Sequence, residues 1–541
     1  CRDNFKHCTD RMTIISDSLI YDLIIATVFL LGCIYYLLTA QFDYWKNRGV
    51  AFVKPIPLFG NLKDQFTKKK NQGEVYDDIY FKLKGNRFGG FFELWEPVLM
   101  IRDPALVEAV LIKDFRHFYD HPFKVDPKID PLGSSLFNLT GSVWKNTRNK
   151  LTPTFTTGKL KMMSEQIFNS GDKMIEHIAE ESKKDKNVDS KTVTSCFSLE
   201  VIASVAFGIQ MDKDSEASKN FRELIPSLLT PTLAQSLKFF STMYAPRVAQ
   251  LLKITMFPKA VENTIVPMIR DTLNYRTKNN VKRNDFLQLM LNIREGDVEG
   301  NKINHEHEED DLIDQMKHVP KEAETDDDNV VFTDMNISAH SINFLLAGLE
   351  AVSSGINFAL LSLAQNPKVQ DRLFEEIDQV MRNHNNVWSY QAVKEMVYLE
   401  EVVQESVRLY PQAPAIFRIC TEDYLIPDSD VVIKEGTRVI IPAHAIMNDP
   451  ENYDSPDVFD PSRFQDNFFK PNGRFIPFGD GPRVCIAMRF AILELKVGLA
   501  RIISAFKVKP SNKLQLPITF EKTAFGPVPV GGFWFEFEKR N

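Results

Sequence analysis

The chain has 541 residues, 44% hydrophobic and 25% charged, a composition typical of a globular protein with a large core. Acidic residues (72) outnumber basic ones (65), and the net charge of −7 argues against nucleic acid held by bulk positive charge. The six cysteines lack close paired spacing, which excludes a disulfide framework or zinc ribbon and favours a reducing compartment. The sequence lacks a Gly-x-Gly-x-x-Gly motif, so it gives no sign of a dinucleotide site.

The N-terminal region divides into two parts. Residues 1–11 are polar and precede Met12, and we expect them to be a non-native leader. Residues 12–42 contain an uncharged apolar run at 23–40, which approaches the length needed to cross a bilayer. A cleaved signal peptide is the alternative, but the run has no basic stretch before it and no clear cleavage site after it. The sequence predicts one N-terminal transmembrane helix.

Charges around this run predict its orientation. Asp17 and Asp22 precede it, whereas Lys46, Arg48 and Lys54 follow it. Basic residues stay on the cytoplasmic side, so residues 43–541 are expected to face the cytosol from the endoplasmic reticulum membrane. The alternating prolines at 55 and 57 then predict a stiff extended spacer, and residues 91–96 and 97–102 a short hairpin.

Trp144 and Arg148 are one helical turn apart and share a face, which by itself is also consistent with a surface Trp–Arg stack. Four lysines nearby form either a solvated face or a docking patch: Lys145, Lys150, Lys159 and Lys161. Residues 296–329 are charge-rich without apolar periodicity; a mobile acidic loop is favoured over a metal site.

Residues 332–365 predict one long, mostly apolar and therefore central helix, capped by Thr333 and stopped before Pro367. Later, Glu405 and Arg408 are three residues apart on one helix face. An ordinary surface ion pair would explain that spacing, and such a pair contributes under about 1 kcal/mol.

The most informative stretch is residues 478–487, in which a lone cysteine, Cys485, follows two glycines and precedes an apolar helical run. Glycines permit a tight turn, and a helix N-terminus favours a thiolate. Such a thiolate can be the proximal ligand of a haem iron, with Arg483 in reach of a propionate. A lone cysteine is otherwise commonly a buried structural residue.

The spacing Phe-x-x-Gly-x-Arg-x-Cys-x-Gly is matched at 478–487 except that Ala487 replaces the last glycine. In this loop the chain resembles the cytochrome P450 family. The resemblance extends from residue 43 to the C-terminus and implies a single mainly α domain with small β-sheets, holding haem b. Within the family, the chain most resembles the microsomal, xenobiotic-oxidising branch, particularly insect detoxification enzymes. Short sequence segments such as residues 151–159 carry this likeness.

The resemblance also implies roles for individual residues. Cys485 would be the axial thiolate and metal ligand. Around the haem it places Phe478, Gly479, Arg483, Trp144, Arg148, Ala347 and, more loosely, Arg418. Glu405 and Arg408 would be buried and joined by Arg463.

On the distal helix the family pattern Ala-Gly-x-Asp/Glu-Thr is matched at Ala347 and Glu350, but Ala351 stands at the threonine position. That hydroxyl normally helps to deliver protons, so we expect Glu350 and Ser354 to substitute in a water relay.

The implied function is NADPH-dependent monooxygenation of lipophilic small molecules, using O2 and electrons from NADPH–cytochrome P450 reductase, with cytochrome b5 as a further candidate donor. The basic patch would dock the acidic donor. The pocket walls implied by the resemblance are residues 122–139, 344–351, 413–417 and 523–528, largely apolar. Two alternatives remain open: a haem-thiolate isomerase that needs no reductase, and a non-catalytic haem-binding protein.

Overall fold

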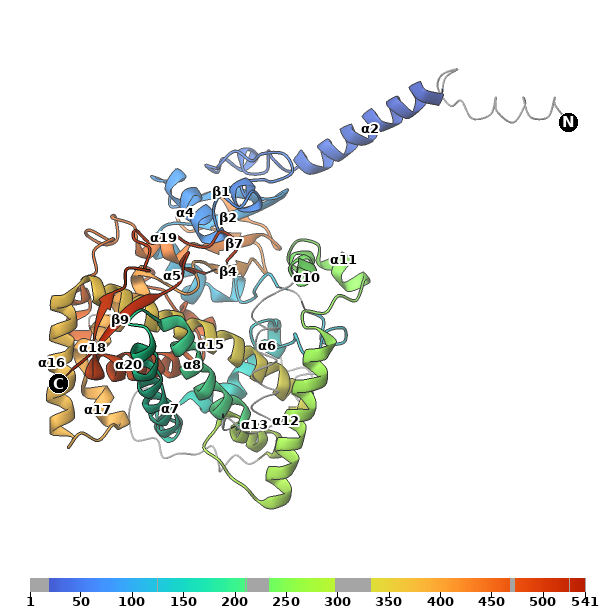
Figure 1. Cartoon of the computed structure of the whole chain (residues 1–541). Helices are drawn as coiled ribbons and strands as arrows, with labels where there is room; N and C mark the ends of the chain where they lie inside the picture. The colour runs from blue at the N-terminus through green and yellow to red at the C-terminus, as the bar shows by residue number, and fades with distance from the viewer. Residues whose placement is uncertain are drawn as a thin grey trace.

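The computed structural model describes residues 19–123, 125–209, 211, 233–296, 332–467, 472–524 and 526–540. The expected leader at 1–11 and nearly all of the acidic segment at 296–329 lie outside these residues. The prediction of a mainly α-helical chain with small β-sheets is confirmed (Figure 1).

The N-terminal half of the described chain contains α2 (Leu19–Thr39), α3 (Lys63–Phe66), α4 (Gln72–Lys82), α5 (Pro104–Glu108), α6 (Gly141–Leu151), α7 (Thr157–Lys184), α8 (Ser190–Phe207), α10 (Leu233–Tyr244) and α11 (Pro246–Leu251). The C-terminal half contains α12 (Lys259–Asn279), α13 (Phe286–Glu295), α15 (Asp334–Gln365), α16 (Pro367–Asn383), α17 (Tyr390–Glu395), α18 (Val397–Leu409), α19 (Ala443–Met447) and α20 (Met488–Ala505).

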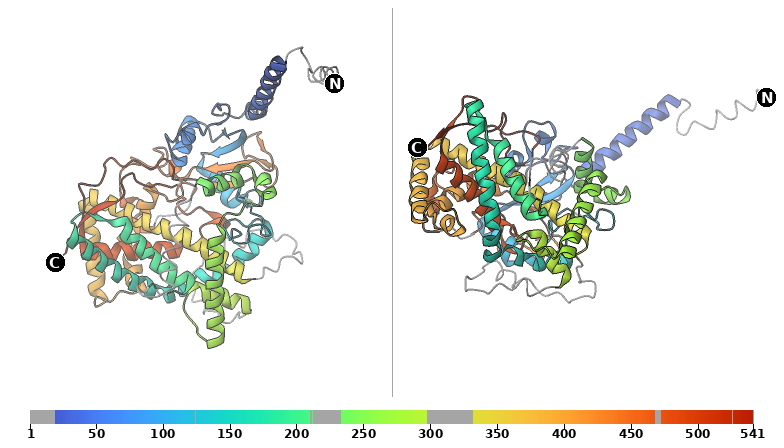
Figure 2. Two further views of the ribbon diagram at one scale, coloured as in Figure 1. Left: turned by 45° about the vertical axis from the view of Figure 1, so that its right-hand side comes forward. Right: turned by 60° about the horizontal axis from the view of Figure 1, so that its bottom comes forward.

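Helix α15 is the centre of the helical layer, as its apolar composition predicts. The Thr333 hydroxyl accepts a hydrogen bond from the Asn336 amide at 3.2 Å and so caps the first turn. The helix ends at Gln365, directly before Asn366 and Pro367. It packs against α8, α12, α18 and α20, and this burial explains why it is apolar on most faces (Figure 2).

The strands form three small sheets. The largest has the order β1-β2-β7-β4 and contains β1 (Phe88–Glu93), β2 (Glu96–Ile101), β7 (Arg438–Ile441) and β4 (Ile416–Ile419). The second contains β3 (Val188–Asp189), β9 (Trp534–Lys539) and β8 (Phe506–Pro510), and the third pairs β5 (Tyr424–Leu425) with β6 (Val432–Ile433). In Figure 1 the four-stranded sheet lies on the side of the globule from which α2 projects.

The predicted hairpin exists, but its turn was misplaced. Strands β1 and β2 are antiparallel and their turn is at Leu94 and Trp95, with Leu94 at φ 58°, rather than at 96 and 97. The first strand also extends back through Gly89 and Gly90. A Cβ atom on Gly90 would lie 2.3 Å from the Trp45 ring, so glycine is needed here for close packing rather than for a chain break.

Two described helices are long and apolar enough to cross a membrane, and their surroundings distinguish them. The span Ile20–Thr39 in α2 is not buried against the rest of the protein, whereas the comparable window of α15 is 67% buried in the core. Figures 1 and 2 show α2 extending away from the globule. The position and exposure of α2 are consistent with the predicted membrane anchor.

We expect removal of residues 1–40 to leave the globular fold intact, because α2 makes no buried contact with it. Removal of residues 1–46 is expected to cost more, because it deletes Trp45, which is fully buried and donates from Nε1 to the Phe91 carbonyl at 3.2 Å. Loss of a large buried aromatic side chain typically costs about 3–5 kcal/mol. Thermal melting of the two truncated chains checks this, and equal melting temperatures would contradict it.

Candidate haem-binding site

The loop before α20 holds Cys485 through its backbone. Gly479 and Gly481 have φ of 77° and 66°, and a Cβ atom on Gly481 would lie 1.9 Å from the Leu111 carbonyl oxygen. The Cys485 amide donates to the Phe478 carbonyl at 2.9 Å. Ala487 has φ −96°, outside the left-handed region, so alanine in place of the family glycine causes no backbone strain.

The electrostatics of Cys485 differ from the expectation of a stabilised thiolate. Burial raises the pKa of the thiol, although the amide of Ala487 and the charge of Arg148 both act to lower that pKa. Removal from water outweighs these two favourable contacts. Coordination to a metal deprotonates a thiol outright, so the loop suits a thiolate ligand when an iron ion is present.

Three arginines gather beside the cysteine loop. Arg148 lies on α6, Arg418 on β4 and Arg483 in the turn before Cys485. The three residues are buried, with relative exposures of 7%, 2% and 8%. Nη2 of Arg148 donates to the Val484 carbonyl at 2.6 Å, which links α6 directly to the cysteine loop.

Their charges are only partly balanced. Burial lowers the pKa of Arg148 to about 10, and burial followed by repulsion from Arg148 lowers the pKa of Arg418 to about 9. The pKa of Arg483 is also lowered, by burial and then by Arg418. Among the described residues, the carboxylate that pairs with this cluster is Asp120, 3.4 Å from Arg483. The cluster therefore carries a surplus of two positive charges.

This surplus fits haem, which carries two propionate groups. The Nε atoms of Arg148 and Arg418 are buried and have no hydrogen-bond partner among the described residues. A buried donor without a partner costs about 1–3 kcal/mol, so an anionic acceptor here would relieve a penalty. The cluster is therefore suited to an acidic ligand that also reaches Cys485.

Trp144 and Arg483 lie together in the structure. The Arg483 guanidinium carbon lies 4.0 Å from the centroid of the Trp144 ring, a cation–π contact. Arg483 also donates from Nε to the Tyr119 carbonyl at 2.7 Å and from Nη2 to the Leu139 carbonyl at 2.9 Å. These bonds use most of its donors, so Arg483 holds the loop at 119–139 in place as well as facing the candidate haem site.

Part of one face of helix α15 is not covered by other side chains. Ala347 is exposed and Ala351 partly exposed, although Leu345 before them and Leu349 between them are buried. Residues four apart lie on one face, so the two alanines border the same opening. Gly348 points elsewhere: its Cβ would lie 2.7 Å from Ile202 of α8, so this glycine allows close helix packing.

Glu350 and Ser354 do lie together, but with a third residue that the sequence did not indicate. Lys191 at the start of α8 donates from Nζ to Glu350 Oε1 and to Ser354 Oγ, both at 2.7 Å. Ser354 Oγ donates to Glu350 Oε1 at 3.1 Å. Burial lowers the pKa of Lys191, although Glu350 acts to raise it. The three polar groups form a closed triad beside Ala351.

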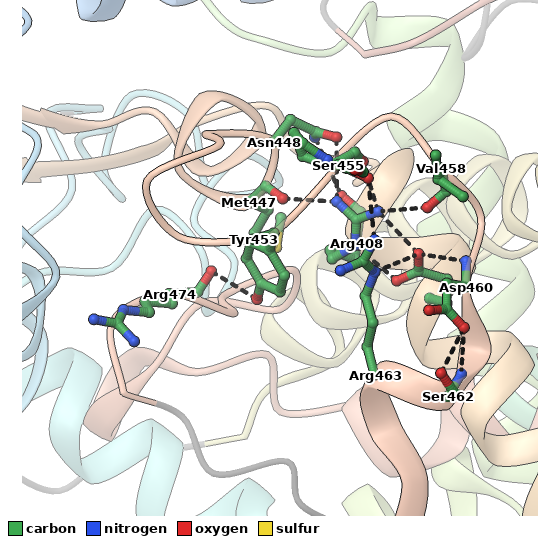
Figure 3. A network of polar contacts seen from close by, with 12 residues as sticks. Arg408, Met447, Asn448, Tyr453, Ser455, Val458, Asp460, Ser462, Arg463 and Arg474 are labelled. Carbon is green, nitrogen blue, oxygen red and sulfur yellow. Dashed lines mark hydrogen bonds and ion pairs between the residues drawn. The ribbon is translucent and has the colours of Figure 1, made fainter.

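The structure brings Glu405, Arg408 and Arg463 together, as the resemblance implies. Figure 3 shows Arg408 and Arg463 within this network. Arg408 donates from Nε and Nη2 to the two oxygens of Glu405 at 2.7 and 2.9 Å, and both side chains are fully buried. Arg408 also donates to the carbonyls of Met447 and Pro456 at 2.8 and 2.7 Å. Arg463 Nε lies 3.4 Å from Glu405 Oε1. The surface-pair alternative is therefore wrong.

Aromatic side chains line part of the expected pocket wall. The ring centroid of Phe123 lies 5.6 Å from that of Phe137 and 6.0 Å from that of Phe417. Phe344 lies at 5.3 Å from Phe155 and belongs to the expected wall at 344–351. Two wall positions, 124 and 525, lie outside the described residues. The described part of the wall thus contains packed aromatic rings, consistent with a lipophilic ligand.

The expected basic patch loses one member. Lys159 is 7% exposed, and burial lowers its pKa, so it does not belong to a solvated surface. It lies in the first turn of α7 next to the buried Leu160 and Met163, on the face that packs inward. Lys145, Lys150 and Lys161 are partly or fully exposed and remain candidates for a docking patch.

Two residues at this site, His121 and Lys191, are not indicated by the sequence. His121 is buried, and its pKa is lowered by burial and by Arg483, Arg418 and Arg148. Lys191 contacts residues 159 and 163 positions later in the chain. Neither residue belongs to a motif, and no local pattern could have singled them out.

Comparison with known proteins agrees with this geometry. The family model described as "Cytochrome P450" matches residues 51–532. The chain is 34% identical over 521 residues to the "Probable cytochrome P450 6a14" of Drosophila melanogaster, covering 94% of this chain and 98% of that protein. It is 32% identical to "Cytochrome P450 6j1" of Blattella germanica (94% and 96% covered) and 32% identical to "Cytochrome P450 6B1" of Papilio polyxenes (96% and 100% covered). The chain belongs to the cytochrome P450 family, the haem-thiolate monooxygenases that its cysteine loop resembles.

Proposed function

We propose that the protein uses NADPH, through NADPH–cytochrome P450 reductase, to insert one oxygen atom from O2 into lipophilic small molecules such as xenobiotics, endogenous lipids or hormones. Cytochrome b5 is a second candidate electron donor. The observation that carries this proposal is the arrangement of a buried cysteine loop, a cationic cluster with a surplus of two charges, and the open face of α15. The aromatic wall formed by Phe123, Phe137 and Phe417 supports a lipophilic substrate.

Each site residue has a proposed role. Cys485 would be the axial ligand, and Arg148 and Arg418 would face the propionates with their unpaired Nε donors. Glu405, Arg408 and Arg463 would support the fold without touching haem. The positions proposed to surround haem without coordinating it are Phe478, Gly479, Arg483, Trp144 and Ala347.

Haem, when bound, supplies the O2 chemistry; the chain supplies the ligand, a dry cavity and protons. Ala351 has no hydroxyl to hold or donate a proton. Glu350 and Ser354 would deliver protons in its place through a water molecule. Lys191 would position both side chains through its hydrogen bonds to Glu350 and Ser354. Because burial already lowers the pKa of Lys191, its ammonium can release a proton more readily than an exposed lysine can.

We expect Ala351→Thr to raise the product formed per NADPH consumed, because a hydroxyl would then stand beside the open face of α15. Ser354→Ala is expected to lower it, because it removes one member of the triad. A positioned proton donor typically raises the reaction rate about 10²–10⁴-fold, and a partial relay loses only part of this gain. We therefore expect each substitution to change the product formed per NADPH by less than about 10-fold.

Ser362→Ala is the matched control, since Ser362 is a buried serine on the same helix that donates only to the Phe358 carbonyl. Product and NADPH are measured together for all variants. If Ala351→Thr and Ser354→Ala both behave as Ser362→Ala does, proton delivery does not use this triad.

The proposed location is the endoplasmic reticulum membrane, with residues 12–42 as the anchor and residues 43–541 as the catalytic domain in the cytosol. The exposed apolar helix α2 and the basic residues that follow it support this orientation. Lys161, which is exposed, and Lys145 and Lys150, which are partly exposed, support docking of an acidic electron donor.

NADPH consumption and type I spectral titration, measured in membranes with and without the reductase over a panel of lipophilic compounds, test the proposal. We expect substrate-dependent product formation that requires both NADPH and the reductase. Turnover in the absence of both NADPH and the reductase would favour the isomerase alternative, which does not need the hydroxyl that Ala351 lacks. Binding spectra without any turnover would favour a carrier protein.

A further inference from the structure

His121 lies inside the cationic cluster but is tied to the loop rather than to the arginines. It is 8% exposed, and its Nδ1 lies 2.9 Å from the Phe137 carbonyl oxygen. Arg483 Nη1 approaches the same oxygen at 3.5 Å. The imidazole and the guanidinium of Arg483 are therefore held side by side by one carbonyl group.

This bond fixes the tautomer of the ring. A carbonyl oxygen only accepts hydrogen bonds, so Nδ1 must carry a hydrogen and donate it. In the neutral ring Nε2 is then an unprotonated acceptor, and no described residue bonds to it. Burial together with Arg483 from the cysteine loop, Arg418 from β4 and Arg148 from α6 keeps the ring neutral by lowering its pKa.

We propose that His121 takes up a proton on Nε2 when haem binds and donates it to a haem propionate. A propionate placed among the three arginines brings a carboxylate beside this ring, and a carboxylate and an unprotonated Nε2 are both acceptors that repel one another. One added proton turns this repulsion into a charge-assisted hydrogen bond. The binding of haem is thereby coupled to a proton at a site away from the iron ligand.

The direction of the pH effect follows from linkage. Haem raises the pKa of His121 above its value in the haem-free protein, so the added affinity is fully present below the haem-free value. It is lost as pH rises through the pKa of the haem-bound state. Between the two values, one proton changes the affinity tenfold per pH unit.

Other charges near the ring must be counted as well. The three arginines stay charged throughout this range, and Asp120, next to His121 in sequence, is paired with Arg483. Deprotonation of Cys485 on coordination favours haem at higher pH, which is the opposite direction. That contribution is common to the wild type and to every His121 variant, so a difference between them isolates His121.

The test is the rate of haem transfer from the loaded protein to an excess of a haem-free globin, measured from about pH 6 to about pH 8.5. His121→Arg keeps a positive charge at all these values, and His121→Gln keeps a neutral donor; neither can titrate. The thiolate-type absorption spectrum of the reduced, carbon-monoxide-bound form first establishes that each variant is loaded.

We expect haem loss from the wild type to accelerate with pH by up to tenfold per unit relative to both variants, and His121→Arg to retain haem best at the high end. Equal pH profiles in the wild type and in either loaded variant would overturn the proposal. If neither variant loads haem, wild-type protein loaded with haem is compared with wild-type protein loaded with haem dimethyl ester, which keeps the iron but has no propionate charge; equal pH profiles for the two would contradict the proposal. Failure of the proposed function would appear instead as an absent thiolate-type spectrum in the wild type.

Discussion

Replacing Arg408 with alanine is expected to prevent stable folding and haem retention, although Arg408 lies outside the arginine cluster beside Cys485. Its guanidinium makes two buried bonds to Glu405, a buried bond to the Met447 carbonyl and a partly buried bond to the Pro456 carbonyl. Alanine leaves the Glu405 carboxylate buried beside the Asp460 amide and Arg463 alone (Figure 3). Removing one partner of a buried pair costs about 3–5 kcal/mol, a large part of the stability of most proteins.

Two further variants separate this effect from a simple loss of charge. Arg382→Ala removes an exposed i,i+4 partner of Asp378 and should cost under about 1 kcal/mol. Arg408→Lys keeps the charge but cannot make the bidentate contact, so it should be intermediate. Thermal melting and haem content are measured for all three. If Arg408→Ala melts and binds haem as Arg382→Ala does, the network has no supporting role.

Replacing Cys485 with alanine is expected to remove the thiolate-type spectrum completely while leaving most of the fold in place. The loop backbone is held by the Cys485 amide on the Phe478 carbonyl and by two glycines with positive φ, none of which depends on the sulfur. The matched control is Cys420→Ala, since Cys420 is also a free cysteine but is buried in the sheet region, where its Sγ donates to the Glu422 carbonyl. The control should keep its spectrum.

Structural features that depend on neighbouring residues in the chain could be predicted from the sequence. The limits of α15 follow from the Thr333 cap and the Pro367 stop, which act within one turn of the chain. Glu405, Arg408 and Arg463 could be grouped only because they occur in order at a family spacing. Neither their burial nor the carbonyls that complete the network follow from spacing alone, because these depend on how α18 meets the loop at 447–463.

Contacts between segments that are far apart in the chain could not be predicted from the sequence. Lys191 reaches Glu350 because α8 crosses α15, a contact between segments 159 residues apart. His121 becomes part of the arginine cluster because α6, β4 and the cysteine loop converge on it. The start of the first hairpin strand was missed because Gly90 accommodates Trp45, a residue far earlier in the chain. The turn was misplaced because it uses Leu94 at φ 58°, and a leucine does not signal a turn in the sequence. Lys159 was assigned to the surface because a single lysine in a polar stretch carries no sign of the face it occupies.

The central claim is that Cys485, held before α20 and beside Arg148, ligates the haem iron as a thiolate. The most direct test is the absorption spectrum of the reduced, carbon-monoxide-bound protein. We predict a Soret band at the position specific to thiolate ligation in the wild type and in Cys420→Ala, and its loss in Cys485→Ala. A wild-type spectrum typical of histidine ligation, or a thiolate band that survives in Cys485→Ala, would contradict the account.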